Sequence, residues 1–194
     1  GQGCDVDEYL IAPDKLPFDL VDIPKPIIGY CGSLTATRLD INLIFLLAQA
    51  NANWQFVLVG PEDDIFKSSS LHQLNNIHFL GSKKPEELPA YVHGFNVCIN
   101  PQLLNEMTIG NYPRKVDEYL AAGKPVVATK TKTMEMFSDY CYLGREVNDF
   151  EKNIENALKE NGNEAIRVRR VNFAKSHTWE SSVNKLYKLI NRNL

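Results

Sequence analysis

The most constraining feature of this chain is a regular alternation of short apolar runs with helix-like segments. Five apolar runs favour strands, at residues 27–31, 54–59, 77–80, 95–99 and 125–129, and a shorter sixth covers 141–143. Helical patterns lie between several of them, at 39–50, from 85 onward and at 115–122. Strands and helices that alternate at this spacing form βαβ units with parallel strands. Because the runs are apolar throughout, their strands should be covered on both faces. The sequence therefore predicts an α/β fold with a doubly wound, mostly parallel, six-stranded Rossmann-like sheet and extra C-terminal helices.

The 194 residues suit one such domain with short appendages. Residues 1–26 are rich in proline and glycine, so we interpret them as an inter-domain linker. Residues 27–176 form the predicted α/β domain. Residues 177–194 are predicted to form a C-terminal amphipathic helix, because apolar side chains recur there at helical spacing: Trp179, Val183, Leu186, Tyr187 and Ile190.

Composition excludes several classes of protein. The 21 basic and 24 acidic residues give a net charge of −3, which argues against a nucleic-acid partner. Apolar runs are much shorter than the ~20 residues of a membrane-spanning helix. The four cysteines form no CxxC pair, so we expect buried free thiols in a reducing, cytoplasmic compartment: Cys4, Cys31, Cys98 and Cys141. Since the chain begins with Gly1, we expect a cut or processed product that lacks an upstream part.

Ligands of open parallel sheets bind beyond the carboxyl ends of the strands, which directs attention to the loops that follow them. The loop at 32–38 contains Gly32, Ser33 and Arg38 just before a helical pattern. Backbone N–H groups at a helix start, with an arginine beside them, can bind phosphate. The alternative is a tight strand-to-helix turn with Arg38 in solvent.

A second, longer loop begins at Asn100 and leads into the helix at 115–122. Its polar residues and those of the following turn are candidates for ligand binding: Asn105, Glu106, Thr108, Tyr112, Arg114, Lys115 and Glu118. Arg114 and Lys115 lie at the positive end of the helix dipole, where cations are disfavoured unless an anion binds. The alternative is that both point into solvent.

Motifs of other nucleotide-binding and catalytic families are missing. The chain has no GxGxxG fingerprint, no GxxxxGK[ST] loop and no GxSxG elbow. The histidines at 72, 78, 93 and 177 are scattered, so we interpret them as surface or packing residues. Asp5-Val6-Asp7 matches a DxD metal–nucleotide pattern but precedes the first strand, so we assign it to the linker.

The segment from Pro113 to Thr129, PRKVDEYLAAGKPVVAT, resembles the nucleotide-sugar motif of GT-B glycosyltransferases of the retaining family 4, also called group 1. Six further segments resemble landmarks of that family and occur in the same order: residues 3–7, 28–34, 56–61, 79–81, 88–91 and 176–180. The resemblance thus covers nearly the whole chain.

In that family two Rossmann-like domains face each other across a cleft, and this chain resembles the C-terminal, donor-binding one. The resemblance implies a bacterial, cytoplasmic enzyme of polysaccharide biosynthesis that moves a hexose from a UDP- or GDP-linked sugar to an acceptor hydroxyl with retention. It implies no metal and no other cofactor. The missing N-terminal acceptor domain would carry any peripheral membrane contact, and this chain alone would be inactive.

The resemblance also implies roles for individual residues. Gly32 and Ser33 would lie near the donor diphosphate, and Arg38 and Lys115 would stabilise the charge that develops on it. Glu118 matches the second glutamate of the family's ExxxxxxxE pair, which accepts hydrogen bonds from the ribose. The remaining donor-binding candidates are Gly81, Ser82 and Lys83 near the base, with Asn105, Glu106, Thr108, Tyr112 and Arg114.

One family residue is replaced: the first glutamate of the pair falls at Gly110. The nearby residues 104–108 resemble a "NELT" variant found in a subset of the family. Because of Gly110, one alternative is a non-catalytic module that has lost the site. A sugar-nucleotide epimerase of the same architecture is a further alternative.

Overall fold

The computed structural model describes residues 6–106, 108–160 and 162–177. Its centre is a sheet of six parallel strands in the order β3-β2-β1-β4-β5-β6. The strands are β1 (Ile27–Cys31), β2 (Gln55–Val59), β3 (Ile77–Gly81), β4 (Val97–Asn100), β5 (Val126–Thr129) and β6 (Tyr142–Gly144). The predicted Rossmann-like fold is confirmed.

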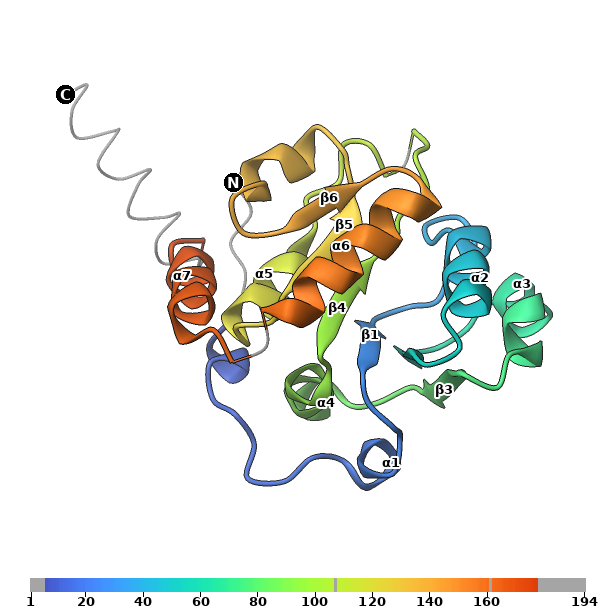
Figure 1. The fold of residues 1–194 in the computed structure, drawn as a ribbon, viewed down its shortest axis with the longest axis horizontal. Helices are drawn as coiled ribbons and strands as arrows, with labels where there is room; N and C mark the ends of the chain where they lie inside the picture. The colour runs from blue at the N-terminus through green and yellow to red at the C-terminus, as the bar shows by residue number, and fades with distance from the viewer. Residues whose placement is uncertain (1–5, 107, 161, 178–194) are drawn as a thin grey trace.

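Helices cover both faces of the sheet (Figure 1). On one face lie α2 (Ile41–Ala50) and α6 (Val147–Lys159), and on the other lie α4 (Leu88–Gly94) and α5 (Arg114–Ala121), with α7 (Glu164–Lys175) beside α5. The shorter elements are η1 (Asp7–Tyr9), α1 (Phe18–Val21), α3 (Asp64–Lys67), η2 (Ser70–Gln73), η3 (Pro85–Glu87) and η4 (Thr133–Phe137).

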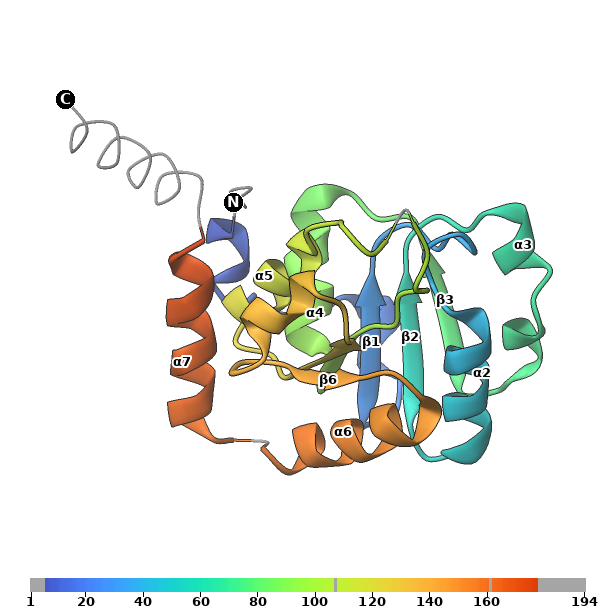
Figure 2. The ribbon, with the colours of Figure 1, turned by 90° about the horizontal axis from the view of Figure 1, so that it is seen from above.

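The continuous apolar strands explain the two layers. All five residues of β1 are buried, and successive side chains alternate between the two faces. Ile27 and Cys31 join the core under α4 and α5, whereas Ile28 and Tyr30 join the core under α2 and α6. Because all the strand pairs are parallel, the carboxyl ends of the strands lie at one edge of the sheet, as the arrowheads of β1 and β2 in Figure 2 show.

Two helix boundaries have clear local causes. The Asp40 carboxylate accepts a hydrogen bond from the Leu43 N–H at 2.9 Å, so α2 begins at Ile41 and not at Leu39 as the pattern predicted. Gly123 follows α5 with φ of +72°, a conformation that ends helices and favours glycine. The helix ends at Ala121, one residue before the predicted end at position 122.

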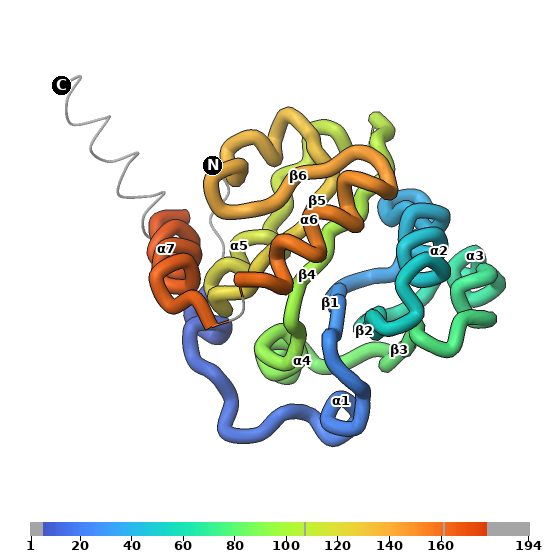
Figure 3. The backbone as a smooth tube through the Cα atoms, viewed as in Figure 1, coloured from blue at the N-terminus to red at the C-terminus, as the bar shows by residue number. Residues whose placement is uncertain are grey.

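The N-terminal segment packs on the α4–α5 side of the domain. Val6, Tyr9 and Leu20 are buried in the core there. Figure 3 shows the segment running from beside α5 and α7 to α1 near α4. The segment therefore contributes to the core. The predicted amphipathic helix at 177–194 lies, beyond His177, outside the described residues.

The described cysteines match the sequence prediction. Cys31, Cys98 and Cys141 are free and buried, and Cys4 lies outside the described residues. Burial raises the pKa of the Cys98 thiol to about 12, so it stays protonated at neutral pH. In the described part of the chain, no helix has the length and apolar character needed to cross a bilayer.

Candidate functional site

A pocket of about 320 Å³ opens at the carboxyl edge of the sheet, between the loops after β1 and β4 and the start of α5. It is lined by Tyr30, Ser33, Arg38, Leu39, Asn100, Gln102, Asn111, Tyr112, Pro113, Arg114 and Lys115. Five of the residues predicted from the sequence are among them. Arg38 and Lys115, far apart in the chain, thus face the same space.

Glycine at position 32 allows Lys115 to lie over the loop after β1. Gly32 has φ of +141°, and a Cβ there would lie 2.3 Å from the Lys115 Nζ. The same ammonium lies 5.7 Å from the centre of the Tyr30 ring, a cation–π contact. The Tyr30 hydroxyl donates to the Ser33 carbonyl at 3.4 Å. The lysine is therefore held between the glycine turn and an aromatic ring.

Hydrogen bonds join the loop after β1 to the loop after β4. The Leu103 N–H donates to the Arg38 carbonyl at 2.9 Å, and the Asn105 side-chain amide donates to the Thr37 carbonyl at 2.8 Å. Asn105 and Thr108 also bond reciprocally, each side chain accepting from the other's backbone N–H. The Asn105 side chain thus holds the backbone next to Arg38 through a hydrogen bond.

Thr108, Glu106 and Gly110 occupy different positions within the β4–α5 loop. Thr108 is buried and its hydroxyl donates to the Leu103 carbonyl, so this side chain supports the loop from inside. Glu106 and Gly110 are exposed. A Cβ added at Gly110 would meet no atom within 4 Å, so the space for a larger side chain exists.

Tyr112 connects the pocket wall to the end of α7. Its hydroxyl donates to Asp117 at 2.5 Å, and the other oxygen of this fully buried carboxylate lies 3.1 Å from Nδ1 of His177. The His177 ring also packs edge-on against Phe137 and Phe173. Sequence analysis treated His177 as a surface or packing residue, and the packing is confirmed.

Glu118 lies one turn into α5, beneath the N-terminal segment. Burial raises the pKa of its carboxyl group, while Lys115, Arg114 and a hydrogen bond with the Tyr9 hydroxyl act in the opposite direction. Glu118 is not among the residues that line the pocket.

Gly81 ends β3, with Ser82 and Lys83 directly after it, and none of the three lines the pocket. Lys83 forms a 2.6 Å ion pair with Asp19, whose other carboxylate oxygen accepts from Tyr91 at 2.8 Å. The bond to Asp19 raises the pKa of Lys83. Through this ion pair Lys83 connects α1 to the loop after β3.

Sequence analysis did not select Asn100, although it lines the pocket. Asn100 ends β4 and is only 2% exposed, and its Nδ2 has no hydrogen-bond partner among the described residues. The sequence did contain a signal for this residue: Asn100 is the polar residue at the end of an otherwise apolar strand, Val97-Cys98-Ile99-Asn100.

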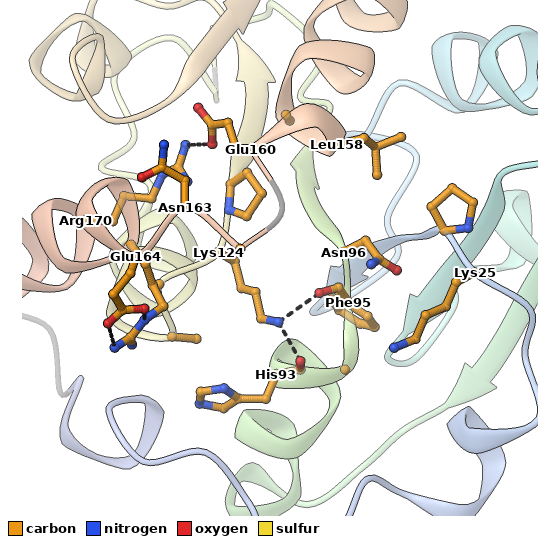
Figure 4. A pocket seen from close by; sticks show the side chains of 18 residues that line it. Lys25, His93, Phe95, Asn96, Lys124, Leu158, Glu160, Asn163, Glu164 and Arg170 are labelled. Carbon is orange, nitrogen blue, oxygen red and sulfur yellow. Dashed lines mark hydrogen bonds and ion pairs between the residues drawn. The ribbon is translucent and has the colours of Figure 1, made fainter.

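A larger pocket, of about 650 Å³, lies at the opposite, amino end of the sheet (Figure 4). Its polar side chains are largely bonded to the protein itself. The Lys124 ammonium donates to the carbonyls of His93 and Phe95 at 2.5 and 2.9 Å, and Arg170 pairs with Glu160 at 2.6 Å. Neither here nor elsewhere in the described residues do three or more potential metal-binding side chains cluster.

Comparison with known families identifies the chain. The family model of glycosyl transferases group 1 matches residues 25–160, which is most of the chain. The chain belongs to this family. The resemblance noted in the sequence is therefore confirmed, and the sheet corresponds to the Rossmann-like half of a GT-B enzyme.

Relatives of this glycosyltransferase domain include TuaH of Bacillus subtilis (strain 168), named as a proposed teichuronic acid biosynthesis glycosyltransferase. It is 30% identical over 168 residues, which cover 84% of this chain and 42% of TuaH. The chain thus spans less than half the length of this relative.

Two solved structures show the same fold. HepE of Anabaena in complex with UDP-glucose superposes with a TM-score of 0.75 at 19% identity, over 99% of this chain and 56% of HepE. TarM superposes with a TM-score of 0.69 at 14% identity, over 97% of this chain and 38% of TarM.

Proposed function

We propose that this glycosyltransferase domain binds the nucleoside-diphosphate sugar of a retaining hexosyltransferase. The observation that carries the proposal is the pocket at the carboxyl edge, lined by Arg38 from the loop after β1 and by Lys115 from the start of α5. Two cations beside a glycine turn and a helix start suit a diphosphate, which carries adjacent negative charges. HepE, with the same fold, was solved with UDP-glucose, which supports a UDP-linked donor.

In the proposed reaction the bond between the sugar and the diphosphate breaks while an acceptor hydroxyl attacks from the same face. The bonding electrons pass to the β-phosphate oxygen, where negative charge accumulates. Arg38 and Lys115 would stabilise that charge, and a well-placed donor of this kind contributes roughly 3–4 kcal/mol to the transition state. The mechanism needs no metal, because these side chains supply the positive charge.

Glu118 would bind the ribose. An ionised carboxylate accepts hydrogen bonds from both hydroxyls of a vicinal diol. Its position on α5, one turn beyond Arg114 and Lys115, is in keeping with the order of ribose and diphosphate in the donor. The acceptor would be bound by another domain of a longer protein, in keeping with the greater length of the relatives, and we place the reaction in the cytoplasm of a bacterium.

Binding and transfer should therefore separate in this chain. Isothermal titration calorimetry with UDP, GDP and their glucose derivatives should show binding of one nucleotide series, whereas an assay of sugar transfer by the 194 residues should show none. Absence of binding in both series would refute the nucleotide site. Robust transfer would refute the need for an acceptor domain.

Gly110 favours one alternative, a module that binds a nucleotide sugar without catalysis. The family's first glutamate contacts the donor sugar, and the glycine at position 110 has no side chain to make this contact. In that case the chain would bind the nucleoside diphosphate and its sugar derivative with equal affinity.

A further inference from the structure

We propose that Asn100 is a further donor-binding residue, whose side-chain amide donates a hydrogen bond to an oxygen of the diphosphate. This inference rests on the proposed nucleotide site and adds a residue that neither the motif nor the family resemblance assigns.

The first observation is an unsatisfied buried donor. Asn100 is 2% exposed and its Nδ2 has no partner within the described residues. A buried amide without a hydrogen bond carries a large desolvation cost, so such groups are rare unless a ligand or water completes them. Asn100 lines the carboxyl-edge pocket, so a molecule in that pocket can reach it.

The second observation is the side of the sheet to which Asn100 belongs. Cys98, two residues earlier in β4, packs in the core under α4 and α5. Side chains alternate along a strand, so Asn100 points to this same face, where α5 begins with Arg114 and Lys115. The amide thus lies on the side of the sheet where Arg114 and Lys115 border the pocket.

The chemistry of the neighbours selects the ligand atom. Arg38, Arg114 and Lys115 line the same pocket and favour an anion. A phosphate oxygen only accepts hydrogen bonds, so an amide N–H is complementary to it, and a neutral donor adds a hydrogen bond without further charge repulsion between cations.

Thr129 provides a matched control. Its hydroxyl is also buried without a partner in the described structure, at the end of the neighbouring strand β5. Val127, two residues earlier, packs under α2 and α6, so Thr129 points to the opposite face from Asn100. It does not line the pocket.

The test compares Asn100→Leu with Thr129→Val, both close in shape to the parent side chain. Removing an unsatisfied amide should leave the melting temperature of the nucleotide-free chain unchanged or higher. The affinity of Asn100→Leu for UDP or GDP, whichever the parent binds, should fall at least tenfold, about 1.4 kcal/mol. Thr129→Val should bind as the parent does. Asn100→Asp, which replaces the donor with a negative charge, should bind more weakly than Asn100→Leu.

Each outcome assigns the result to one hypothesis. Equal loss with UDP and UDP-glucose supports the diphosphate contact, whereas loss with UDP-glucose alone would overturn it in favour of the sugar. Parental affinity in Asn100→Leu, with a lowered melting temperature, would show a structural amide and overturn the inference. If the parent binds no nucleotide, the proposed function itself fails.

Discussion

The two pockets at opposite ends of the sheet differ in what their polar groups already bind. The amino-end pocket is the larger, about 650 Å³ against 320 Å³, but Arg170 and Glu160 in it form an ion pair and the Lys124 ammonium donates to two backbone carbonyls. The carboxyl-edge pocket is smaller, yet it contains an unsatisfied amide at Asn100 and three cations, Arg38 from the loop after β1 and Arg114 and Lys115 from the start of α5. Unsatisfied polar groups therefore distinguish a candidate binding site better than volume does.

The largest expected effect comes from removing two of the three cations that line the smaller pocket, Arg38 and Lys115. Arg38→Ala combined with Lys115→Ala should weaken nucleotide binding by about 100-fold or more, because each charge-assisted hydrogen bond contributes about 1.5–3 kcal/mol. Calorimetric titration with UDP and GDP measures the loss. Arg167→Ala, which removes a cation from the amino-end pocket, is the control and should change affinity by less than about twofold. If Arg167→Ala weakened binding and the double variant did not, the nucleotide would bind in the amino-end pocket instead.

The second expected effect concerns stability rather than binding. The Arg170 side chain is 6% exposed and bonds to Glu160 and to the Tyr140 carbonyl. Arg170→Ala removes the cation from the largely buried Glu160 carboxylate, which keeps only the hydrogen bond from the Tyr142 hydroxyl, and should lower the free energy of unfolding by about 3 kcal/mol. Urea denaturation measures it, and the nucleotide affinity of the folded variant should stay at the parent value. A large loss of affinity would show that the two ends of the sheet are coupled.

A third prediction uses pH to test Glu118. Burial raises its pKa above the ordinary value of 4.5, so on acidification this carboxylate takes up a proton earlier than an exposed glutamate does. Only the ionised form accepts both ribose hydroxyls, so nucleotide affinity should fall as the pH is lowered toward the raised pKa. Because the folded state holds the proton more tightly, the same group makes the fold less stable as the pH rises through that interval.

The matched variant is Glu118→Gln. It should bind nucleotide about tenfold more weakly at neutral pH, since a hydrogen bond to a charged group contributes about 1.5–3 kcal/mol, and its affinity should vary less with pH. An unchanged pH profile in Glu118→Gln would assign the titration to another group.

The smallest effect is expected at Gly110, where a new side chain meets open space. Gly110→Glu should change the free energy of unfolding by less than about 0.5 kcal/mol. If the family's first glutamate contacts the sugar, this variant should bind UDP-glucose severalfold more tightly than UDP, relative to the parent. Gly110→Gln tests whether the charge is needed. No change in the affinity ratio would support a pocket that does not recognise the sugar through this position.

The comparison also explains what could be predicted from sequence. Apolar runs and their spacing predict parallel strands, so a site at the carboxyl ends of the strands, with Arg38 and Lys115, followed from local patterns. The ion pair between Lys83 and Asp19 could not be predicted, because Asp19 lies in a segment that was interpreted as a linker. The missing partner of Asn100 could not be read from sequence either, since it depends on every neighbouring group in space.

The hydrogen bonds that join the loops after β1 and β4 have a consequence for how a ligand is captured. With Leu103 bonded to Arg38, Asn105 to Thr37 and Asp40 to Pro101, the two loops form one continuous wall. A preassembled wall loses little conformational entropy when a molecule binds, so more of the interaction energy appears as affinity. Asn105 would then affect ligand affinity indirectly. Its amide bonds to the backbone and so helps to order the wall before the ligand binds.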